Sequence, residues 1–494
     1  IKSTKHVKLL PVLLIISYNA YPQGMFDQPV PIDPAIKIGK LENGMTYYIR
    51  HNEEPKDRVS FYMIQNVGAL LEEDNQNGLA HFLEHMAFNG TKHYPGKGIL
   101  DYLEKNGVAF GRNINAYTAF SETVYNLSDV PSTKKGLIDS CLLVLHDWSN
   151  YLLLTDEEIE AERGVIAEEW RTRRTADFRM RNKYFPVLLK GSKWEVRDVI
   201  GDLDIIKTFN PETIRKFYHD WYRTDLQAIA IVGDVDVDEI EGKIKELFSQ
   251  IPAVENAMER PVFEIPEHDE TRFVLATDEE ATSSQIRLMI KHKGADKTEK
   301  NLAYLREDYI SNLFNRMSGD RIDELLQKGN PPFINGAVQV SGFLRGYDVA
   351  IIFATANPNK EDESLRAIYT ETQRILKHGF TEGELNRAKI NLLTEMESAY
   401  KQRDKIRNDQ YVSGIQNHFL SGEPLTDAEF DWQFGQGAIE SISLEDVNDL
   451  AKRMIVDKNR VLIIQGPESG ATHLTKEEAF AILEEVEKSR KIFG

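Results

Sequence analysis

Two stretches of the chain share one pattern and lie about 230 residues apart, a spacing that constrains the fold more than any other feature. FNPETIRKFYHDWYRTDLQAIAIVG (209–233) aligns without a gap with ISLEDVNDLAKRMIVDKNRVLIIQG (442–466). Each stretch predicts a capped amphipathic helix, then a buried strand that ends in a glycine turn. The period is too long for a solenoid and therefore indicates two copies of one domain.

Strand-like runs at 58–67 and 347–356 are interspersed with long helical patterns in both copies. This order predicts an α+β fold of two tandem homologous domains, each a mainly antiparallel sheet packed against helices. The proline-containing stretch 252–266 suits neither a helix nor a central strand. We therefore place the first domain at residues 25–255 and the second at residues 262–494.

The first 24 residues have the pattern of a secretory signal peptide. Three lysines precede the apolar run LLPVLLII (9–16), which is too short to cross a bilayer, and a polar segment follows. The alternative is a disordered tail. We expect export, and we do not expect an integral membrane protein. Because the chain begins with Ile1 instead of methionine, we expect a fragment of a longer gene product.

Composition excludes two classes of protein. A net charge of −19 and a pI near 5.2 argue against binding to nucleic acid through phosphate contacts. A single cysteine, Cys141, excludes an intramolecular disulfide framework. Since Cys141 sits in the apolar helical run GLIDSCLLVLHDW, we expect an inert core thiol.

The stretch HFLEHMAFNGT (81–91) carries the strongest chemical signal in the chain. On a helix, His81 and His85 lie on one face, where two neutral imidazoles can hold a zinc ion. Glu84 is then free to act as a base, and HxxEH is the inverzincin signature. The alternative is a pair of capped or solvent-exposed histidines. A zinc hydrolase also needs a third protein ligand.

The best source of a third ligand is TDEEIEAERGVIAEEWRTRR (155–174), a helix that should begin at a capping box of Thr155 and Glu158. Its spacing predicts one buried stripe that carries two carboxylates, Glu162 and Glu169, among the apolar residues Ile159, Val165 and Ile166. An unpaired carboxylate is costly in such a stripe, and a metal or histidine would offset that cost. The alternative is a stripe exposed at the rim of a charged helix.

HFLEHMAFNGT, NINAYT (113–118) and ERGVIAEEW (162–170), in that order, resemble the pitrilysin or insulinase family of zinc metallopeptidases. FYHDWY…AIVGDVD (217–236) resembles the end of that family's first domain. The resemblance covers most of residues 35–470, and long bacterial periplasmic members are closest. It implies one zinc ion per chain, bound by His81, His85 and Glu169. Glu84 would be the catalytic base, and Glu162 would orient a ligand histidine, with Glu162 as the alternative third ligand.

The resemblance also implies a substrate-binding edge strand. Asn115, Ala116 and Tyr117 would pair with an extended peptide backbone, and Phe88 would line the pocket beside the scissile bond. Taken alone, an Asn-Ala-Tyr tripeptide is weak evidence, and Phe88 could equally be a core residue. Other histidines, such as His146 and His219, show no ligand spacing, so we expect them to be structural or surface groups.

The predicted function is therefore a zinc endopeptidase that hydrolyses peptides or unfolded polypeptide segments through a metal-activated water, with a glutamate as general base. The alternative is a non-catalytic family member that binds peptide or acts as a scaffold. The equivalent region of the second copy, 305–327, contains no histidine, which predicts an inactive repeat. By resemblance, two such halves enclose the substrate. We thus expect a homodimer, or a missing C-terminal half that closes the chamber, and a periplasmic location.

Overall fold

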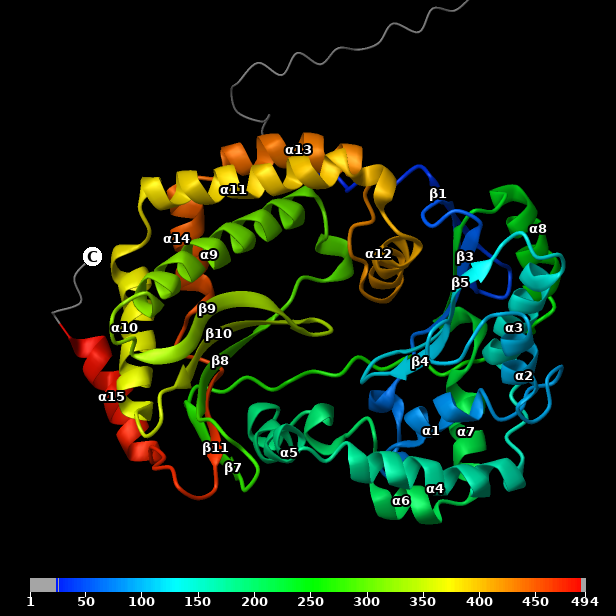
Figure 1. Ribbon diagram of the computed structural model, residues 1–494, viewed down its shortest axis with the longest axis horizontal. Coiled ribbons are helices and arrows are strands. Elements are labelled where there is room, and N and C mark those ends of the chain that lie inside the picture. The colour runs from blue at the N-terminus through cyan, green and yellow to red at the C-terminus, as the bar shows by residue number, and fades with distance from the viewer. Residues whose placement is uncertain (1–23, 25, 490–494) are drawn as a thin grey trace, which may run out of the picture.

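The computed structural model describes residue 24 and residues 26–489 (Figure 1). The predicted signal peptide, apart from Gly24, lies outside the described residues. Within them the chain forms two sheets, one in the first half of the molecule and one in the second. Helices pack against both sheets, which confirms the predicted fold class of two α+β units, each with a sheet against helices.

The first sheet has the strand order β1-β2-β6-β3-β5-β4. All neighbours are antiparallel except β2 and β6, which are parallel. This order places β4 at one edge, where β5 is its only strand neighbour in the sheet. The strands are β1 (Ile36–Lys40), β2 (Thr46–His51), β3 (Arg58–Gln65), β4 (Ile114–Thr118), β5 (Thr123–Pro131) and β6 (Gln227–Gly233).

The second sheet, with the order β7-β11-β8-β10-β9, repeats the topology of five strands of the first, β2-β6-β3-β5-β4. Here too one pair, β7 and β11, is parallel and the rest are antiparallel. β9 therefore takes the edge position that β4 takes in the first sheet. The strands are β7 (Arg272–Asp278), β8 (Gln285–Lys293), β9 (Phe333–Leu344), β10 (Tyr347–Ala356) and β11 (Arg460–Pro467).

The aligned repeats form the predicted helix and strand in both halves. The first contains α7 (Pro211–Trp221) and then β6, and the second contains α14 (Leu444–Met454) and then β11. β6 and β11 are interior strands, and nearly every residue in them is buried. A strand that is buried on both faces is apolar along its whole length, which explains why these segments carry the clearest repeat signal.

One face of each sheet packs into an apolar core to which helices of its own half contribute. In the first half these are α1 (Leu79–Met86), α2 (Gly98–Lys105), α3 (Leu137–Asn150), α4 (Asp156–Thr172), α6 (Leu203–Thr208), α7 and α8 (Val237–Phe248). In the second half they are α9 (Leu302–Leu326), α10 (Glu361–His378), α11 (Glu382–Lys401), α13 (Ala428–Ser441), α14 and α15 (Lys476–Lys488). Cys141, on α3, is fully buried as expected.

The opposite face of each sheet is covered by a helix from the other half (Figure 1). From the first half, α5 (Ala176–Leu188) lies against β7 and β11, and its Met180 and Leu188 join the core of the second sheet. From the second half, α12 (Asn408–Ser421) lies against β6 and β3, and its Val412 and Ile415 join the core of the first sheet. The two halves are therefore joined by two reciprocal apolar contacts.

The Ile415→Ala variant tests the α12 contact. Ile415 is fully buried against the first sheet although it belongs to the second half. Removing its side chain leaves a cavity, so we expect the free energy of unfolding to fall by about 2–5 kcal/mol. Ser413→Ala on the exposed face of α12 is the control. Chemical denaturation measures both, and equal stability of the two variants would contradict this packing.

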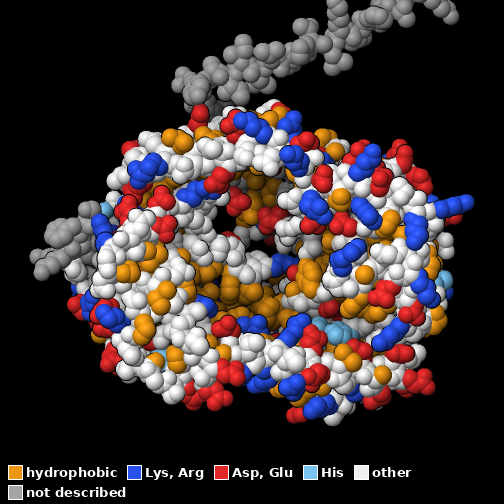
Figure 2. All heavy atoms as spheres, in the orientation of Figure 1, with side chains coloured by type: hydrophobic (Ala, Val, Ile, Leu, Met, Phe, Trp, Pro, Cys, Tyr) orange, Lys and Arg blue, Asp and Glu red, His pale blue; other side chains and the backbone are white. Residues whose placement is uncertain are grey.

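A cavity of about 1150 Å³ lies between the two halves, and Figure 2 shows the hollow at the centre of the molecule. Its wall includes Ser121 near β4, Arg260 and Phe263 in the segment between the halves, and Arg345 in the β9–β10 turn. The predicted domain boundary, 255–262, would fall in this connecting segment, between α8 and β7. Within the described part of the chain, no helix is both long and apolar enough to cross a membrane.

Candidate metal centre

The helix that carries the HxxEH motif is held by groups at its N-terminus. Gly78 precedes α1 with φ 104°, and a side chain there would meet the backbone of Gly201, so this turn requires glycine. The buried carboxylate of Glu72 accepts hydrogen bonds from the N–H groups of Gly78 (3.1 Å) and Ala80 (2.8 Å). It thereby satisfies donors that the first turn of a helix leaves free. The start of α1 is therefore fixed by the close approach of Gly78 to Gly201 and by the Glu72 side chain.

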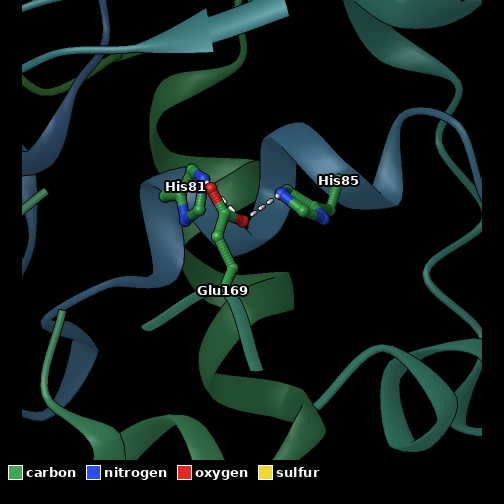
Figure 3. A group of neighbouring side chains, drawn as sticks. All are labelled: His81, His85 and Glu169. Atoms are coloured by element: carbon green, nitrogen blue, oxygen red, sulfur yellow. Dashed lines mark ion pairs between the residues drawn. The ribbon is translucent and has the colours of Figure 1, made fainter. Parts of the chain in front are cut away.

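His81, His85 and Glu169 converge at one point between α1 and α4 (Figure 3). Glu169 Oε2 lies 3.7 Å from His81 Nε2 and 3.3 Å from His85 Nε2. Figure 3 shows the carboxylate pointing toward both rings. The structure thus brings together the three residues that the sequence analysis expects as ligands.

Glu162, one helical stripe position earlier on α4, lies on the far side of His85. Its Oε1 accepts a 2.8 Å hydrogen bond from His85 Nδ1, and its Oε2 accepts one of 2.5 Å from Asn89. In the neutral ring, an Nδ1–H held by a carboxylate leaves the lone pair on Nε2, the atom that faces Glu169, for a metal. This placement suits an orienting group, and Glu169 rather than Glu162 faces both histidines.

The buried stripe on α4 is narrower than predicted. Thr155 begins the helix by accepting a hydrogen bond from the Glu158 N–H, and Ile159 and Ile166 are fully buried. Val165, which we placed on the buried face, is instead 52 % exposed. Successive helical residues are 100° apart, so Val165 lies well round the helix from Ile159 and reaches solvent. Glu162 and Glu169 are partly buried, between the core and the rim.

The pKa values of the two histidines in the cluster are shifted in opposite directions. Burial, together with the neighbouring His85, lowers the pKa of His81 to about 4, so this ring is neutral near pH 7. Burial also opposes a charge on His85, but hydrogen bonds to Glu162 and Glu169 outweigh it and raise its pKa to about 9. The hydrogen bond to His85 is the main reason that the pKa of Glu169 falls to about 2. The two carboxylates therefore favour a cation between them.

Glu84 is buried beside this cluster and does not join it. Its side chain is 8 % exposed, and its Oε2 accepts a 2.6 Å hydrogen bond from Thr118 Oγ1 on the edge strand β4. Burial raises the pKa of Glu84, while the Thr118 hydrogen bond opposes that shift. Glu84 is therefore a carboxylate with a fixed orientation and an elevated proton affinity, as a general base requires.

The donor set fits a zinc ion. In a tetrahedral site with zinc–ligand distances of about 2.0–2.1 Å, ligand atoms lie about 3.3 Å apart, close to the separations seen here. His81 is buried, its Nδ1 has no hydrogen-bond partner among the described residues, and its Nε2 is too far from Glu169 for a hydrogen bond. Nε2 is therefore available to a metal, and a metal there would join His81 to Glu169. Two imidazoles and one carboxylate are an established catalytic zinc set.

Of the expected substrate residues, Phe88 donates its N–H to the backbone carbonyl of His85 at 3.0 Å, and the other three lie on the strand that carries Thr118. Asn115, Ala116 and Tyr117 belong to β4, and Tyr117 accepts a hydrogen bond from Gln416 on α12. Phe88 is partly buried and makes edge-to-face contacts with Phe110 and Trp148. Phe110 is 55 % exposed and Trp148 is fully buried, so this aromatic group reaches solvent at its Phe110 end.

Sequence reasoning missed three groups that bind carboxylates at or beside the cluster. Thr118 binds Glu84, Asn89 binds Glu162, and Arg173 forms a 2.5 Å ion pair with Glu169 Oε1. Thr118 and Asn89 stand inside the motifs NINAYT and HFLEHMAFNGT, so their proximity to the site was available as a signal. Arg173 lies four residues after Glu169, a spacing at which helical side chains meet.

Two family models match the chain. The model described as "Insulinase (Peptidase family M16)" matches residues 47–184, and the one described as "Peptidase M16 inactive domain" matches residues 208–392. The chain belongs to peptidase family M16. The first match contains both histidines, Glu84, Glu162 and Glu169, and thus the whole cluster.

M16 relatives include the "Probable zinc protease PqqL" of Escherichia coli (strain K12), which is 30% identical over 439 residues. That alignment covers 88% of this chain and 46% of the relative. A "Zinc protease PQQL-like" of Arabidopsis thaliana is 30% identical over 435 residues, which cover 88% of this chain and 42% of the relative. The chain thus spans less than half the length of these relatives.

Solved structures give the same fold. The first half of the periplasmic protease PqqL from Escherichia coli superposes with a TM-score of 0.85 at 28% identity, covering 94% of this chain and 98% of that one. Against the crystal structure of PqqL itself, the TM-score is 0.86 and the match covers 51% of that chain. This M16 chain therefore corresponds in extent to one half of such a protein.

Proposed function

We propose that the chain is the catalytic part of a zinc endopeptidase. The observation that carries the proposal is the convergence of His81, His85 and Glu169 beside the buried carboxylate of Glu84. Membership of a peptidase family whose relatives are named zinc proteases supports the same reading. In this proposal the three converging residues hold one zinc ion per chain, and Glu162 keeps His85 in the ligand tautomer.

The chemistry is hydrolysis without a covalent intermediate. Bound zinc would act as a Lewis acid toward a water molecule and the scissile carbonyl. Glu84 accepts a proton from the attacking water and returns it to the leaving amine. Thr118 holds Glu84 in the orientation for that transfer through its hydrogen bond to Oε2. Arg173 and His85 keep Glu169 ionised, as a metal ligand must be.

The substrate class follows from the edge strand. β4 has one side unpaired in the sheet and carries Asn115, Ala116 and Tyr117. An extended peptide can add to such an edge through backbone hydrogen bonds, while a pocket near Phe88 selects a side chain. Folded proteins rarely offer a free extended segment, so we propose peptides or unfolded polypeptide segments as substrates.

Comparison with the relatives supports proposals for the cellular location and the assembly of the chain. PqqL of Escherichia coli is described as a periplasmic protease, and we propose that this chain is also exported, with residues 1–24 as its signal peptide. Since the chain spans less than half of its curated relatives, we propose that a further half, or a second copy, closes the chamber. We also propose the domain division at 25–255 and 262–494, with the second domain inactive.

Zinc content and cleavage of an unfolded polypeptide, measured together, test the proposal. We expect the purified chain to carry a zinc ion at this centre and to cleave the polypeptide. A chelator should abolish cleavage, and added zinc should restore it. A folded chain that binds no zinc at His81 and His85 would instead favour a non-catalytic peptide-binding protein. The proposed further half is then added to the chain. Activity that appears only after this addition indicates an incomplete chamber, and activity absent in both cases indicates an inactive centre.

Replacing Thr118 by Val tests its role as the group that orients Glu84. The variant loses a hydrogen bond to a charged acceptor, worth about 1.5–3 kcal/mol, so kcat should fall by about 10-fold or more. KM and zinc content should not change, because Thr118 contacts neither ligands nor metal. Thr118→Ser, which keeps the hydroxyl, is the matched control and should retain most of the activity. Equal loss in both variants would exclude the hydrogen bond as the cause.

A further inference from the structure

A second group of potential ligands lies outside the HxxEH cluster. His93, in the segment after α1, meets His146 and Asp147 at the end of α3. One potential ligand atom from each lies within 4.8 Å of the other two. The group shares no residue with the first centre. His146 was expected to be a structural or surface group because it shows no ligand spacing in the sequence, and His93 lies 53 residues earlier.

The carboxylate of Asp147 is fully buried and carries an unusual set of contacts. Its Oδ2 accepts hydrogen bonds from Thr91 Oγ1 (2.7 Å) and from the His93 N–H (2.8 Å). Its Oδ1 faces both imidazoles, at 2.8 Å from His93 Nδ1 and 3.3 Å from His146 Nδ1. One oxygen is therefore anchored, and the other is presented to two histidines.

A buried carboxylate needs a compensating positive charge. Within the described residues, the ion-pair partners of Asp147 are these two histidines, and no lysine or arginine pairs with it. The nearby Lys92 places its ammonium over the ring of Tyr151, 4.7 Å from the ring centre. The cation for Asp147 must therefore be a protonated histidine or a metal ion.

The rings are also held in place. His146 stacks on Tyr151 with ring centres 4.5 Å apart and contacts the edge of Phe248. The backbone N–H of His93 donates a hydrogen bond to the Asp147 carboxylate, which holds this residue in place. One protonated histidine would be enough to neutralise the charge of Asp147. Two rings directed at Asp147 Oδ1 form a set of nitrogen and oxygen ligands that suits zinc.

We propose that His93, His146 and Asp147 form a second zinc site, bound through both Nδ1 atoms and Asp147 Oδ1. The His93 side chain is 37 % exposed, so solvent can reach the remaining coordination position. The site ties the segment after α1 to α3. That segment includes Asn89, which binds Glu162, so the second metal stabilises the surroundings of the first centre without contacting it.

Zinc titration of the metal-free chain tests the proposal. By equilibrium dialysis, the parent should bind two zinc ions per chain, and His93→Gln should bind one. His219→Gln, an exposed histidine on α7, is the matched control and should still bind two. Binding of the same number of ions by the parent and by His93→Gln would overturn the second site.

A second experiment separates this site from the first and does not depend on the stoichiometry of the parent. In a His85→Gln background, zinc should raise the melting temperature by several degrees, and the added His93→Gln change should remove that shift. An unchanged shift in the double variant would overturn the proposal. If His93→Gln fails to fold, anomalous scattering at the zinc edge from zinc-soaked parent crystals decides. A peak between His93 and His146 supports the site, and no peak there refutes it.

Discussion

The Glu84→Gln chain is expected to bind zinc as the parent does and to lose activity, with kcat lower by a factor of about 10²–10⁴. Glutamine has nearly the same shape and can still meet Thr118, but it cannot accept the proton of the attacking water. Glu84 makes no contact with the converging ligand atoms of His81, His85 and Glu169, so the metal should remain. Zinc analysis and single-turnover cleavage of a peptide measure the two effects separately.

Two results would speak against this role of Glu84. Parent-like cleavage by the Glu84→Gln chain would assign the base to another group. Loss of zinc from the variant would mean that Glu84 supports the metal rather than the proton transfer. Activity lost while zinc is retained is the outcome that the geometry predicts.

The second large effect concerns the third ligand. Glu169→Gln should lose the zinc ion of the first centre, and cleavage with it, because the amide replaces the carboxylate that faces both histidines. Glu162→Gln should keep most of that zinc at saturating concentration, with an affinity lower by about 10–100-fold, since it only orients His85. Glu168→Gln, exposed on the same helix, is the control and should behave as the parent.

Metal titration of these three variants separates the alternatives. Loss of the metal in Glu162→Gln alone would make Glu162 the ligand, contrary to the geometry of α4. Equal loss in both variants would indicate that His85 requires Glu162 to bind at all. Each variant is also made with His93→Gln, so that the measured zinc content reports the first centre alone.

Much of the fold could be predicted because it depends on local pattern. The two helix–strand repeats, the strands at 58–65 and 347–356 and the capped helix from 156 appear where their periodicity places them. The HxxEH motif predicts its own geometry, since residues four apart on a helix share a face. The prediction of Glu169 as the third ligand required more than spacing. The predicted stripe on α4 carries two carboxylates, Glu162 and Glu169, and the family resemblance favoured Glu169.

The rest depends on contacts between residues far apart in the chain. No periodicity in α5 or α12 indicates that the sheet each one covers belongs to the other half. Val165 was misplaced because a spacing pattern cannot show where a buried stripe ends. Thr118 and His146 have partners 34 and 53 residues away, at Glu84 and His93. Such pairings exist only once the helices have packed.

The exchange of α5 and α12 has a consequence for how the molecule loses its structure. Each sheet would expose an apolar face if the other half unfolded first, so neither half can melt alone at low cost. We therefore expect a single cooperative transition on heating, although the chain contains two sheets. A chain cut in the connecting segment should stay together as two tightly associated pieces. α4 leads directly into α5, so Glu169 loses its place at the metal centre only when the whole molecule comes apart.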